Sequence, residues 1–288
     1  WLRERFPGLT QSQSREIFER GWVRDGRGRA RAKGDAVPGD VDVSAWVRRL
    51  AELRSPRRDL AVTVLADVED FWIVDKPAGL PGHPLGVDDL STITQWAFGC
   101  DARVETEFPE PLPTVTPHRL DVGTSGCLVV AKTRAGFDRW REAFAAHRIE
   151  KSYLAWTWGS SAPKKCVVRR PIGPVPGDKR RRRALEENAR GENVYAAETA
   201  LEPVETRAAM TLWRATCRTG VTHQVRVHLA AIGFPLVGDT LYDPDSAARP
   251  TTPNHHWLRA VELRSPFGDY TAPDDTFRTL PERLGQER

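Results

Sequence analysis

Two periods of hydrophobic and polar positions run through the chain, and the first is that of a β-strand. From residue 61 onward, AVTVLADVEDFWIVD contains two apolar runs separated by a polar turn at residues 68–70, which predicts two strands. In KSYLAWTWG, residues 151–159, side chains alternate between two faces with a period of two, as in a strand. AAMTLWRATCRTG, residues 208–220, predicts a further strand.

The second period is that of an α-helix. Phe137, Trp140 and Phe144 share one face of a helix that should begin at Thr133. THQVRVHLAAIG predicts another helix, with Thr222 as its N-cap and a glycine as its C-terminal stop. A helical period is therefore present, but in fewer segments than the strand period.

The order of these segments predicts the fold class. Strand signals outnumber helix signals and do not alternate regularly with them, which favours an α+β fold over a doubly wound parallel sheet. We expect a mixed, largely antiparallel central sheet with flanking helices. Residues 177–192, GDKRRRRALEENARGE, have no apolar period and predict either an exposed loop or the frayed end of a hairpin.

The first 45 residues predict a small α/β unit of their own. Thr10 or Ser12 can cap a helix that ends at Gly21, and turn signals follow at residues 25–26 and 38–40. Two short helices followed by small strands would fit this pattern. The charged residues 46–60 are interpreted as a linker, and residues 61–288 as the main domain.

Positive charge is concentrated at the front of the chain. The formal net charge is +4, and residues 1–60 hold 14 Lys and Arg against 9 Asp and Glu. Arg24, Arg27, Arg29, Arg31 and Lys33 would cluster on one exposed edge. Such a cluster is either a solvated surface or a contact for a polyanion, because basic side chains release counterions from phosphates.

Other features of the composition limit the class of protein. The four cysteines, Cys100, Cys127, Cys166 and Cys217, are far apart and form no zinc or redox motif, so we expect buried free thiols. The sequence contains no signal peptide, no membrane-length apolar run and no phosphate-loop or dinucleotide motif. These observations predict a cytoplasmic protein.

One polar loop precedes an apolar strand and carries candidate chemistry. In TPHRLDVGTSGCLVV, Asp121 lies directly before a β-branched run, where a rigid scaffold often presents functional residues. A lone loop aspartate is more often a turn former or the partner of an arginine. Here small residues follow it and should leave space for a bulky ligand, while Arg119 could keep it ionised.

Several other polar residues have simpler interpretations. Lys76 should support a loop, and His118 and His223 are expected to make structural hydrogen bonds. His255–His256 has no third ligand at metal spacing and is interpreted as surface. The run Arg180–Arg183 is either solvated or, beside an RNA site, in contact with phosphates; we weigh these two interpretations equally.

Four stretches in order resemble the RluA-type pseudouridine synthases. They are VDKPAGLPGHP, HRLDVGTSG, KSYLAW and TGVTHQVRVHLAAIGFPLVGDTLY, and the resemblance covers about residues 61–270. The front unit resembles a small RNA-binding domain named after a protein of the small ribosomal subunit, on FPGLTQSQSREIFERGWVRDGR and the later PGDVDV. The resemblance implies a pseudouridine synthase fold.

The resemblance also implies roles for single residues. Asp121 matches the catalytic aspartate, Tyr153 the aromatic residue that stacks on the target base, and Arg226 the arginine that pairs with the aspartate. Arg119 matches an arginine near the flipped-out nucleotide. Val221 stands where a basic residue is common, which could remove one phosphate contact.

The implied activity is the isomerisation of specific uridines in ribosomal or transfer RNA to pseudouridine. The product has the same atoms as the substrate, so no cofactor or metal is expected; the partner is RNA, bound also by His223 and the front arginines, and a monomer is expected. Asp121 could act as a nucleophile or as a base. The alternatives are a non-catalytic RNA-binding or ribosome-assembly factor that keeps the fold, and a glycosidase that would release free uracil.

Overall fold

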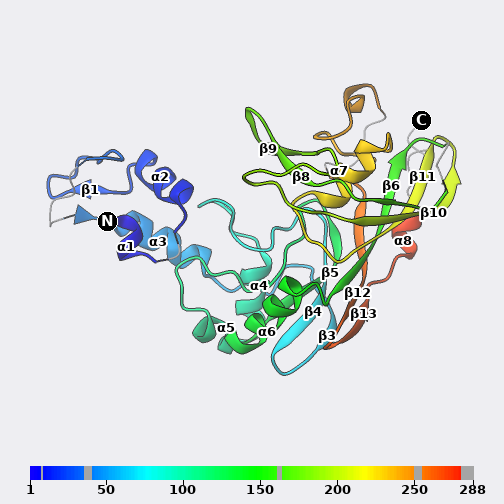
Figure 1. The fold of residues 1–288 in the computed structure, drawn as a ribbon. Coiled ribbons are helices and arrows are strands. Elements are labelled where there is room, and N and C mark those ends of the chain that lie inside the picture. Colours follow the sequence, from blue (N-terminus) through cyan, green and yellow to red (C-terminus); the bar gives the residue numbers. More distant parts are fainter. Residues whose placement is uncertain (8, 36–40, 161–163, 250–254, 280–288) are drawn as a thin grey trace.

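A large twisted sheet forms the body of the molecule (Figure 1). The computed structural model describes the chain except for residues 8, 36–40, 161–163, 250–254 and 280–288. Within the described residues the sheet has the order β3-β4-β5-β12-β6-β11-β10-β7, with β13 beside β12. The strands are β3 Thr63–Asp67, β4 Phe71–Lys76, β5 Ser125–Ala131, β6 Glu150–Trp158, β7 Cys166–Val168, β10 Thr199–Arg207, β11 Met210–Cys217, β12 Leu258–Ser265 and β13 Gly268–Thr271.

The pairing of these strands is mixed and mostly antiparallel. Only the contact between β5 and β12 is parallel among the described pairs, with Arg259 opposite Ser125 and Ala260 opposite Gly126. The turn predicted at residues 68–70 joins β3 to β4. The predicted α+β class with a mixed, largely antiparallel sheet is confirmed.

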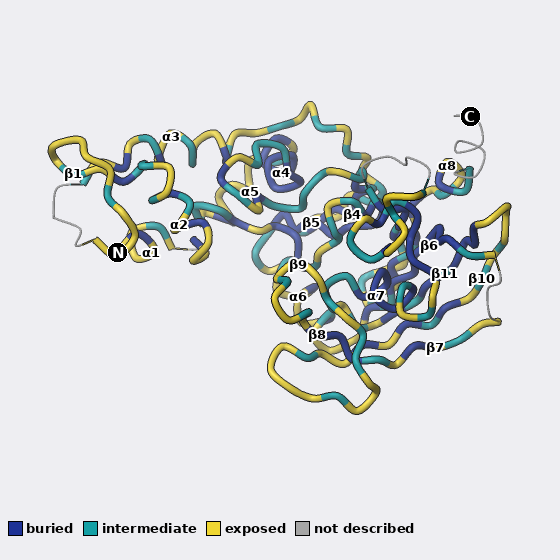
Figure 2. The backbone as a smooth tube through the Cα atoms, turned by 90° about the horizontal axis from the view of Figure 1, so that it is seen from above, coloured by how far each residue is buried: buried dark blue, intermediate teal, exposed yellow. Residues whose placement is uncertain are grey.

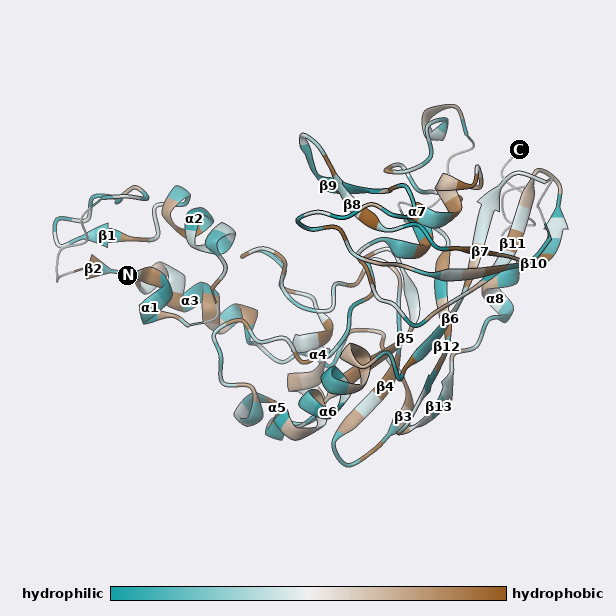
Figure 3. Ribbon diagram, in the orientation of Figure 1, coloured by the Kyte–Doolittle hydropathy of each residue, from teal (hydrophilic) through white to brown (hydrophobic). Residues whose placement is uncertain are grey.

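Helices cover both faces of the sheet (Figures 1 and 3). One face holds a cluster that includes Trp140 from α6 and Leu229 from α7. The opposite face holds a cluster with Trp96 from α4 beside the β4–β5 half, and another with Phe277 from α8 beside the β6–β11 half. These helices are α4 Ile93–Cys100, α5 Ala102–Glu107, α6 Arg134–Ala145, α7 Gln224–Ala231 and α8 Asp275–Arg278, and a 3₁₀ turn spans Ser246–Ala248.

Strand β6 shows how the pattern of side chains fixes the two faces. Because successive side chains point to opposite sides, Leu154 and Trp156 join one cluster while Tyr153 and Ala155 join the other. Both faces are covered, so β6 is buried along nearly its whole length (Figure 2). This places Tyr153 on the face that packs against α7.

The segment with the arginine run forms a hairpin. Strand β8, Ile172–Val175, pairs antiparallel with β9, Asp178–Ala184. Of the two predicted alternatives for this part of residues 177–192, the hairpin is therefore confirmed. It lies beside α7, separate from the main sheet (Figure 1).

The front unit packs around a separate hydrophobic cluster that also includes Val87 of the main domain, and the unit extends further than the sequence analysis predicts. Its elements are α1 Leu2–Arg5, α2 Gln11–Glu19, β1 Arg24–Asp25, β2 Val41–Asp42 and α3 Ser44–Leu53. Helix α3 lies within the predicted linker, yet Trp46 and Leu53 are buried with Ile17 in the front core. The assignment of residues 46–60 as a linker is wrong for α3, because this helix buries an apolar face despite its charged residues.

The predicted helix boundaries are partly confirmed. Thr10 and Gln13 form a capping box at α2, and Thr133 caps α6. At α7 the predicted cap, Thr222, is wrong: His223 occupies the N-cap with φ of 61° and caps no amide with its side chain. The predicted turn at residues 38–40 lies outside the described residues.

No helix in the described part of the chain is long and apolar enough to cross a membrane.

Candidate active site

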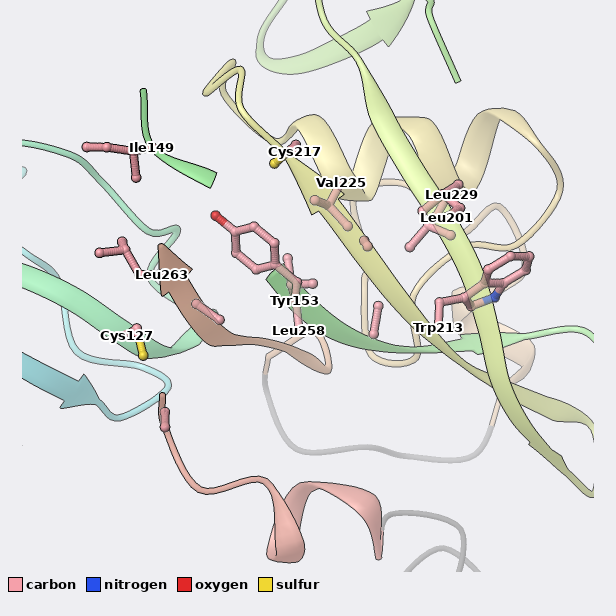
Figure 4. Close-up of a cluster of buried hydrophobic side chains, with 14 of the residues drawn as sticks. Cys127, Ile149, Tyr153, Leu201, Trp213, Cys217, Val225, Leu229, Leu258 and Leu263 are labelled. Carbon is pink, nitrogen blue, oxygen red and sulfur yellow. The ribbon is translucent and has the colours of Figure 1, made fainter. Parts of the chain in front are cut away.

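A pocket opens where the loop before β5 meets the segment before α7. It encloses about 500 Å³ of space, part of it open to solvent. Asp121, Tyr153 and Arg226, which come from three different parts of the chain, all line it. Figure 4 shows Tyr153 on β6 among Cys217, Val225 and Leu258. The remaining lining residues are Arg119, Leu120, Thr124, Lys151, Thr219, Gly220, Val221, Thr222, His223 and Gln224.

Lys76 supports the loop that carries Asp121 through hydrogen bonds to its backbone and to the loop after β4. This lysine is fully buried, and its Nζ donates to the carbonyl oxygens of Pro77, Leu80 and Val122 at 2.9, 2.9 and 3.1 Å. Burial lowers the pKa of Lys76 to about 7, although the charge of Asp121 opposes the shift. The predicted loop-supporting role of Lys76 is confirmed.

The small residues after Asp121 serve packing. A Cβ on Gly123 would lie 2.9 Å from the His256 ring, and one on Gly126 would lie 2.0 Å from the Ala260 carbonyl oxygen. Gly126 also has φ of 107°, which side-chain-bearing residues rarely adopt. The prediction that these glycines leave space for a ligand is wrong, because neighbouring residues of the fold fill that space.

Arg226 is the centre of a buried charge cluster. Its Nε and Nη2 donate to the two carboxylate oxygens of Asp239 at 2.8 and 2.9 Å. This bidentate pair leaves Nη1 to donate to Asp121 Oδ2 at 2.9 Å. The side chains of Arg226 and Asp239 are 8% and 1% exposed, whereas Asp121 is 15% exposed, so Asp121 is the most accessible of the three in the pocket that Arg226 also lines. The Asp121 carboxylate is thereby fixed in direction.

The charges around Asp121 favour its ionised form. Burial alone would raise the pKa of Asp121, but the positive charges of His223 and Arg226, with the Arg226 hydrogen bond, bring it below its usual value. Burial opposes the charge of Arg226 too, yet its two carboxylate partners raise its pKa. Among described contacts Arg119 makes none with Asp121, so the arginine that keeps Asp121 ionised is Arg226.

His223 forms the second side of the cluster. Its Nε2 lies 3.9 Å from Asp121 Oδ2, and its Nδ1 lies 2.7 Å from the Tyr242 hydroxyl. Burial lowers the pKa of His223, although the charge of Asp121 opposes the shift. The predicted hydrogen-bonding role of His223 is confirmed. His118 also has its predicted role, since its Nε2 accepts from Val129 N–H at 3.0 Å.

Tyr153 and Lys151 project from β6 into the pocket wall. Burial raises the pKa of Tyr153 well above its usual value, so its hydroxyl stays protonated at neutral pH. Lys151 Nζ donates to the Thr219 carbonyl oxygen at 2.7 Å and ties β6 to the loop before α7. An aromatic ring and a carboxylate therefore face the same space.

His256 is buried, which corrects its predicted surface position. It is 7% exposed, and its Nε2 lies 2.8 Å from Thr124 Oγ1. Burial and the charge of Arg226 lower its pKa to about 4. His256 thus packs behind the Asp121 loop as a neutral ring. Among the described residues no group of three or more His, Cys, Asp or Glu side chains could hold a metal ion.

The other predicted RNA contacts divide between the front unit and the rim of this pocket. Arg119 is exposed at its rim. None of the five basic residues predicted in the front unit lines it. Arg24, Arg27, Arg29 and Lys33 are exposed, and Arg31 is partly buried.

Sequence analysis missed two partners in the site. Asp239 stands in the fourth matched stretch, and its role becomes visible only from the contact with Arg226, 13 residues earlier. The Tyr242 ring lies 5.0 Å from the Arg226 guanidinium. The signal for both was the acidic and aromatic residues in GDTLY.

Comparison with known proteins identifies the class that this fold and pocket define. A family model described as RNA pseudouridylate synthase matches residues 70–231. RNA pseudouridine synthase 2, chloroplastic, from Arabidopsis thaliana is 27% identical over 274 residues, which cover 84% of this chain and 63% of the relative. Ribosomal large subunit pseudouridine synthase D from Nitrosomonas europaea is 36% identical over 194 residues, 65% of this chain and 53% of the relative.

A solved structure shares the fold. Human RNA pseudouridylate synthase domain containing 1 superposes with a TM-score of 0.59 at 25% identity, covering 78% of this chain and 95% of that one. The chain belongs to the RNA pseudouridylate synthase family, since the family model covers more than half of it. It spans less than two thirds of the length of the two curated relatives above.

Proposed function

We propose that the chain is an RNA pseudouridine synthase that isomerises uridines in ribosomal or transfer RNA, with Asp121 as its catalytic residue. The observation that supports this most is the pair of buried contacts that aim an ionised Asp121 into an open pocket lined by Tyr153. The names of the relatives support RNA as the substrate class.

The pocket contains most of the groups that the reaction requires. The bond from the sugar to the uracil nitrogen breaks, the base turns, and a bond from the sugar to carbon 5 forms; carbon 5 loses a proton and the nitrogen gains one. A single carboxylate suffices, either as the nucleophile at the sugar carbon or as the base for a sugar proton. An ordinary glycosidase uses two carboxyl groups and a water.

Each neighbouring residue has a place in this proposal. Arg226 keeps Asp121 charged and oriented at no cost of rearrangement during the reaction, because Asp239 already fixes the guanidinium. Tyr153 supplies a ring against which the extruded base stacks, since the base must leave its helix to be reached. Arg119 and His223 at the rim would contact the extruded nucleotide.

The remaining features of the proposal concern the whole molecule. The front unit serves as a small RNA-binding domain, residues 61–288 as the catalytic domain, and Arg24, Arg27, Arg29, Arg31 and Lys33 as phosphate contacts. The protein works in the cytoplasm as a monomer, without a metal or cofactor.

The substitution Asp121→Asn tests the proposal. Arg226 keeps Asp239 as a partner, so the fold should survive, and tritium release from carbon 5 of uracil in unmodified RNA transcripts should fall by roughly 10²–10⁴-fold or more. The exposed Asp138→Asn on α6 serves as the control and should release tritium at the wild-type rate.

Two results would contradict the proposal. If a folded Asp121→Asn protein reacts within tenfold of the wild-type rate, Asp121 takes no part in the chemistry. A tenfold change in rate corresponds to about 1.4 kcal/mol of activation free energy. A wild-type protein that makes no pseudouridine in any transcript would support the non-catalytic RNA-binding factor, and chromatography showing free uracil would support a glycosidase.

A further inference from the structure

A second pocket adjoins the one around Asp121. The segment Thr219–Thr222 lines both, so it forms a common wall. The far side of the second pocket comes from the β8–β9 hairpin and the segment after it, with Lys179, Arg182 and Tyr195. A ligand chain that leaves the first pocket across this wall enters the second.

Tyr195 offers a fixed but open aromatic surface to this pocket. Its side chain is 56% exposed, more than any other large hydrophobic residue described as exposed. Its backbone is nevertheless held to β8, since its N–H donates to the Ile172 carbonyl at 3.0 Å and its carbonyl accepts from Ile172 N–H at 2.9 Å. An exposed ring on a fixed backbone loses little entropy when a flat ligand stacks on it.

The charge of the second pocket suits a phosphate. None of its described lining residues is acidic, while Lys179 and Arg182 are basic. Val221 supplies no charge to the common wall. Lys179 and Arg182 supply positive charge from the opposite side. The far side of the second pocket therefore presents an aromatic ring and two positive charges together, opposite the common wall.

Strand β9 is also connected to the catalytic cluster. The backbone N–H of Arg182 donates to the Tyr242 hydroxyl at 2.9 Å, and that hydroxyl lies 2.7 Å from His223 Nδ1. His223 in turn approaches Asp121. The second pocket is thus fixed in position relative to Asp121 through Tyr242 and His223.

We propose that this second pocket binds an unpaired nucleotide adjacent to the target uridine, with its base stacked on Tyr195 and its phosphate beside Lys179 and Arg182. Stacking on a ring tolerates any base, so the pocket adds affinity and selects single-stranded surroundings without reading sequence. The inference rests on the proposed function, because it takes the first pocket as the site of the target uridine.

Binding measurements without turnover test the inference. The probe is a short fluorescein-labelled single-stranded oligouridylate, bound to the full chain carrying Asp121→Asn so that no reaction occurs. Tyr195→Ala should weaken binding roughly 5–100-fold, the value of one stacked base, whereas Tyr195→Phe keeps the ring and should bind within about twofold of its parent. Val204→Ala, an exposed residue on β10, is the matched surface control.

Salt dependence separates stacking from charge. Tyr195→Ala should weaken binding without changing the slope against salt, while Lys179→Gln and Arg182→Gln should each reduce that slope by about 0.7. Equal affinity of Tyr195→Ala and its parent overturns the inference, and so does the absence of oligouridylate binding by the parent. If wild type forms no pseudouridine, the proposed function fails by itself, because this assay requires no turnover.

Discussion

The Asp121 pocket and the front unit use charge in opposite ways. Around Asp121, Arg226 and Asp239 are almost excluded from solvent and fixed by bidentate hydrogen bonds. In the front unit, Arg27 and Arg29 are exposed on short turns. Buried charges cost desolvation and act through orientation, whereas exposed charges act through long-range attraction that salt screens. One region can therefore supply chemistry, and the other affinity.

The largest effect should follow from breaking the buried cluster at Asp239. Asp239→Asn keeps the size of the side chain but removes one of the two oxygen acceptors that hold Arg226. The guanidinium should then rotate, and Asp121 should lose its fixed orientation. We expect turnover at saturating RNA to fall about 10²-fold, as misplacement of a reacting group does. Single-turnover pseudouridine formation measures it.

Two controls sharpen this prediction. Asp243→Asn breaks another ion pair of a buried aspartate, that of Asp243 with the partly exposed Arg249 at 3.0 Å, outside the pocket; it should lower the melting temperature but spare turnover. Raising the pH should not restore turnover of Asp239→Asn. Asp121 stays ionised beside the positive charge of Arg226, so the defect is one of orientation and not of protonation. If turnover of Asp239→Asn matches that of Asp243→Asn, the clamp has no role in orientation.

These residues also show what the sequence can predict. Strands β3, β4, β5 and β11 are predictable from apolar runs and β6 from its alternation, and the resemblance of ordered motifs points to Asp121, Tyr153 and Arg226. The contact of Asp239 with Arg226 depends on how the chain turns after α7, and no periodicity encodes it. The lack of a third metal ligand beside His255–His256 carries no information about burial, so the sequence does not reveal that His256 packs against Thr124.

The front unit shows a different reason for failure. Helix α3, SAWVRRLAEL, places Trp46, Leu50 and Leu53 at helical spacing, but its charges favoured a linker. The partner that completes this core includes Val87 of the main domain, fully buried in the same cluster. A local pattern cannot reveal a partner that lies 40 residues away in the sequence.

A smaller effect is expected from the exposed arginines. Replacing Arg24, Arg27 and Arg29 together with glutamine should weaken RNA binding roughly tenfold or more and reduce the salt slope by about 2–3, with turnover at saturation unchanged. Filter binding across a salt series measures both. This is a cleaner test than removing residues 1–45, because that deletion would uncover Trp46 and Val87.

A charge-matched control decides whether position matters. Arg103, Lys165 and Arg218 are exposed on the main domain, and their joint replacement with glutamine removes the same charge. If both triple variants reduce affinity and slope equally, the front arginines contribute only net charge, and the front unit has no RNA-binding edge of its own.

The smallest effect should come from the ion pair that joins the front unit to the main domain. Arg20 donates to Asp88 through both terminal nitrogens, but the two side chains are 34% and 58% exposed. Such pairs contribute about 0–1 kcal/mol, so Arg20→Gln should lower unfolding stability by no more than about 1 kcal/mol, and less at high salt. A double-mutant cycle with Asp88→Asn, read by denaturant unfolding, isolates the pair. A coupling energy well above about 1 kcal/mol would mean that charge, and not the apolar contact around Val87, holds the front unit in place.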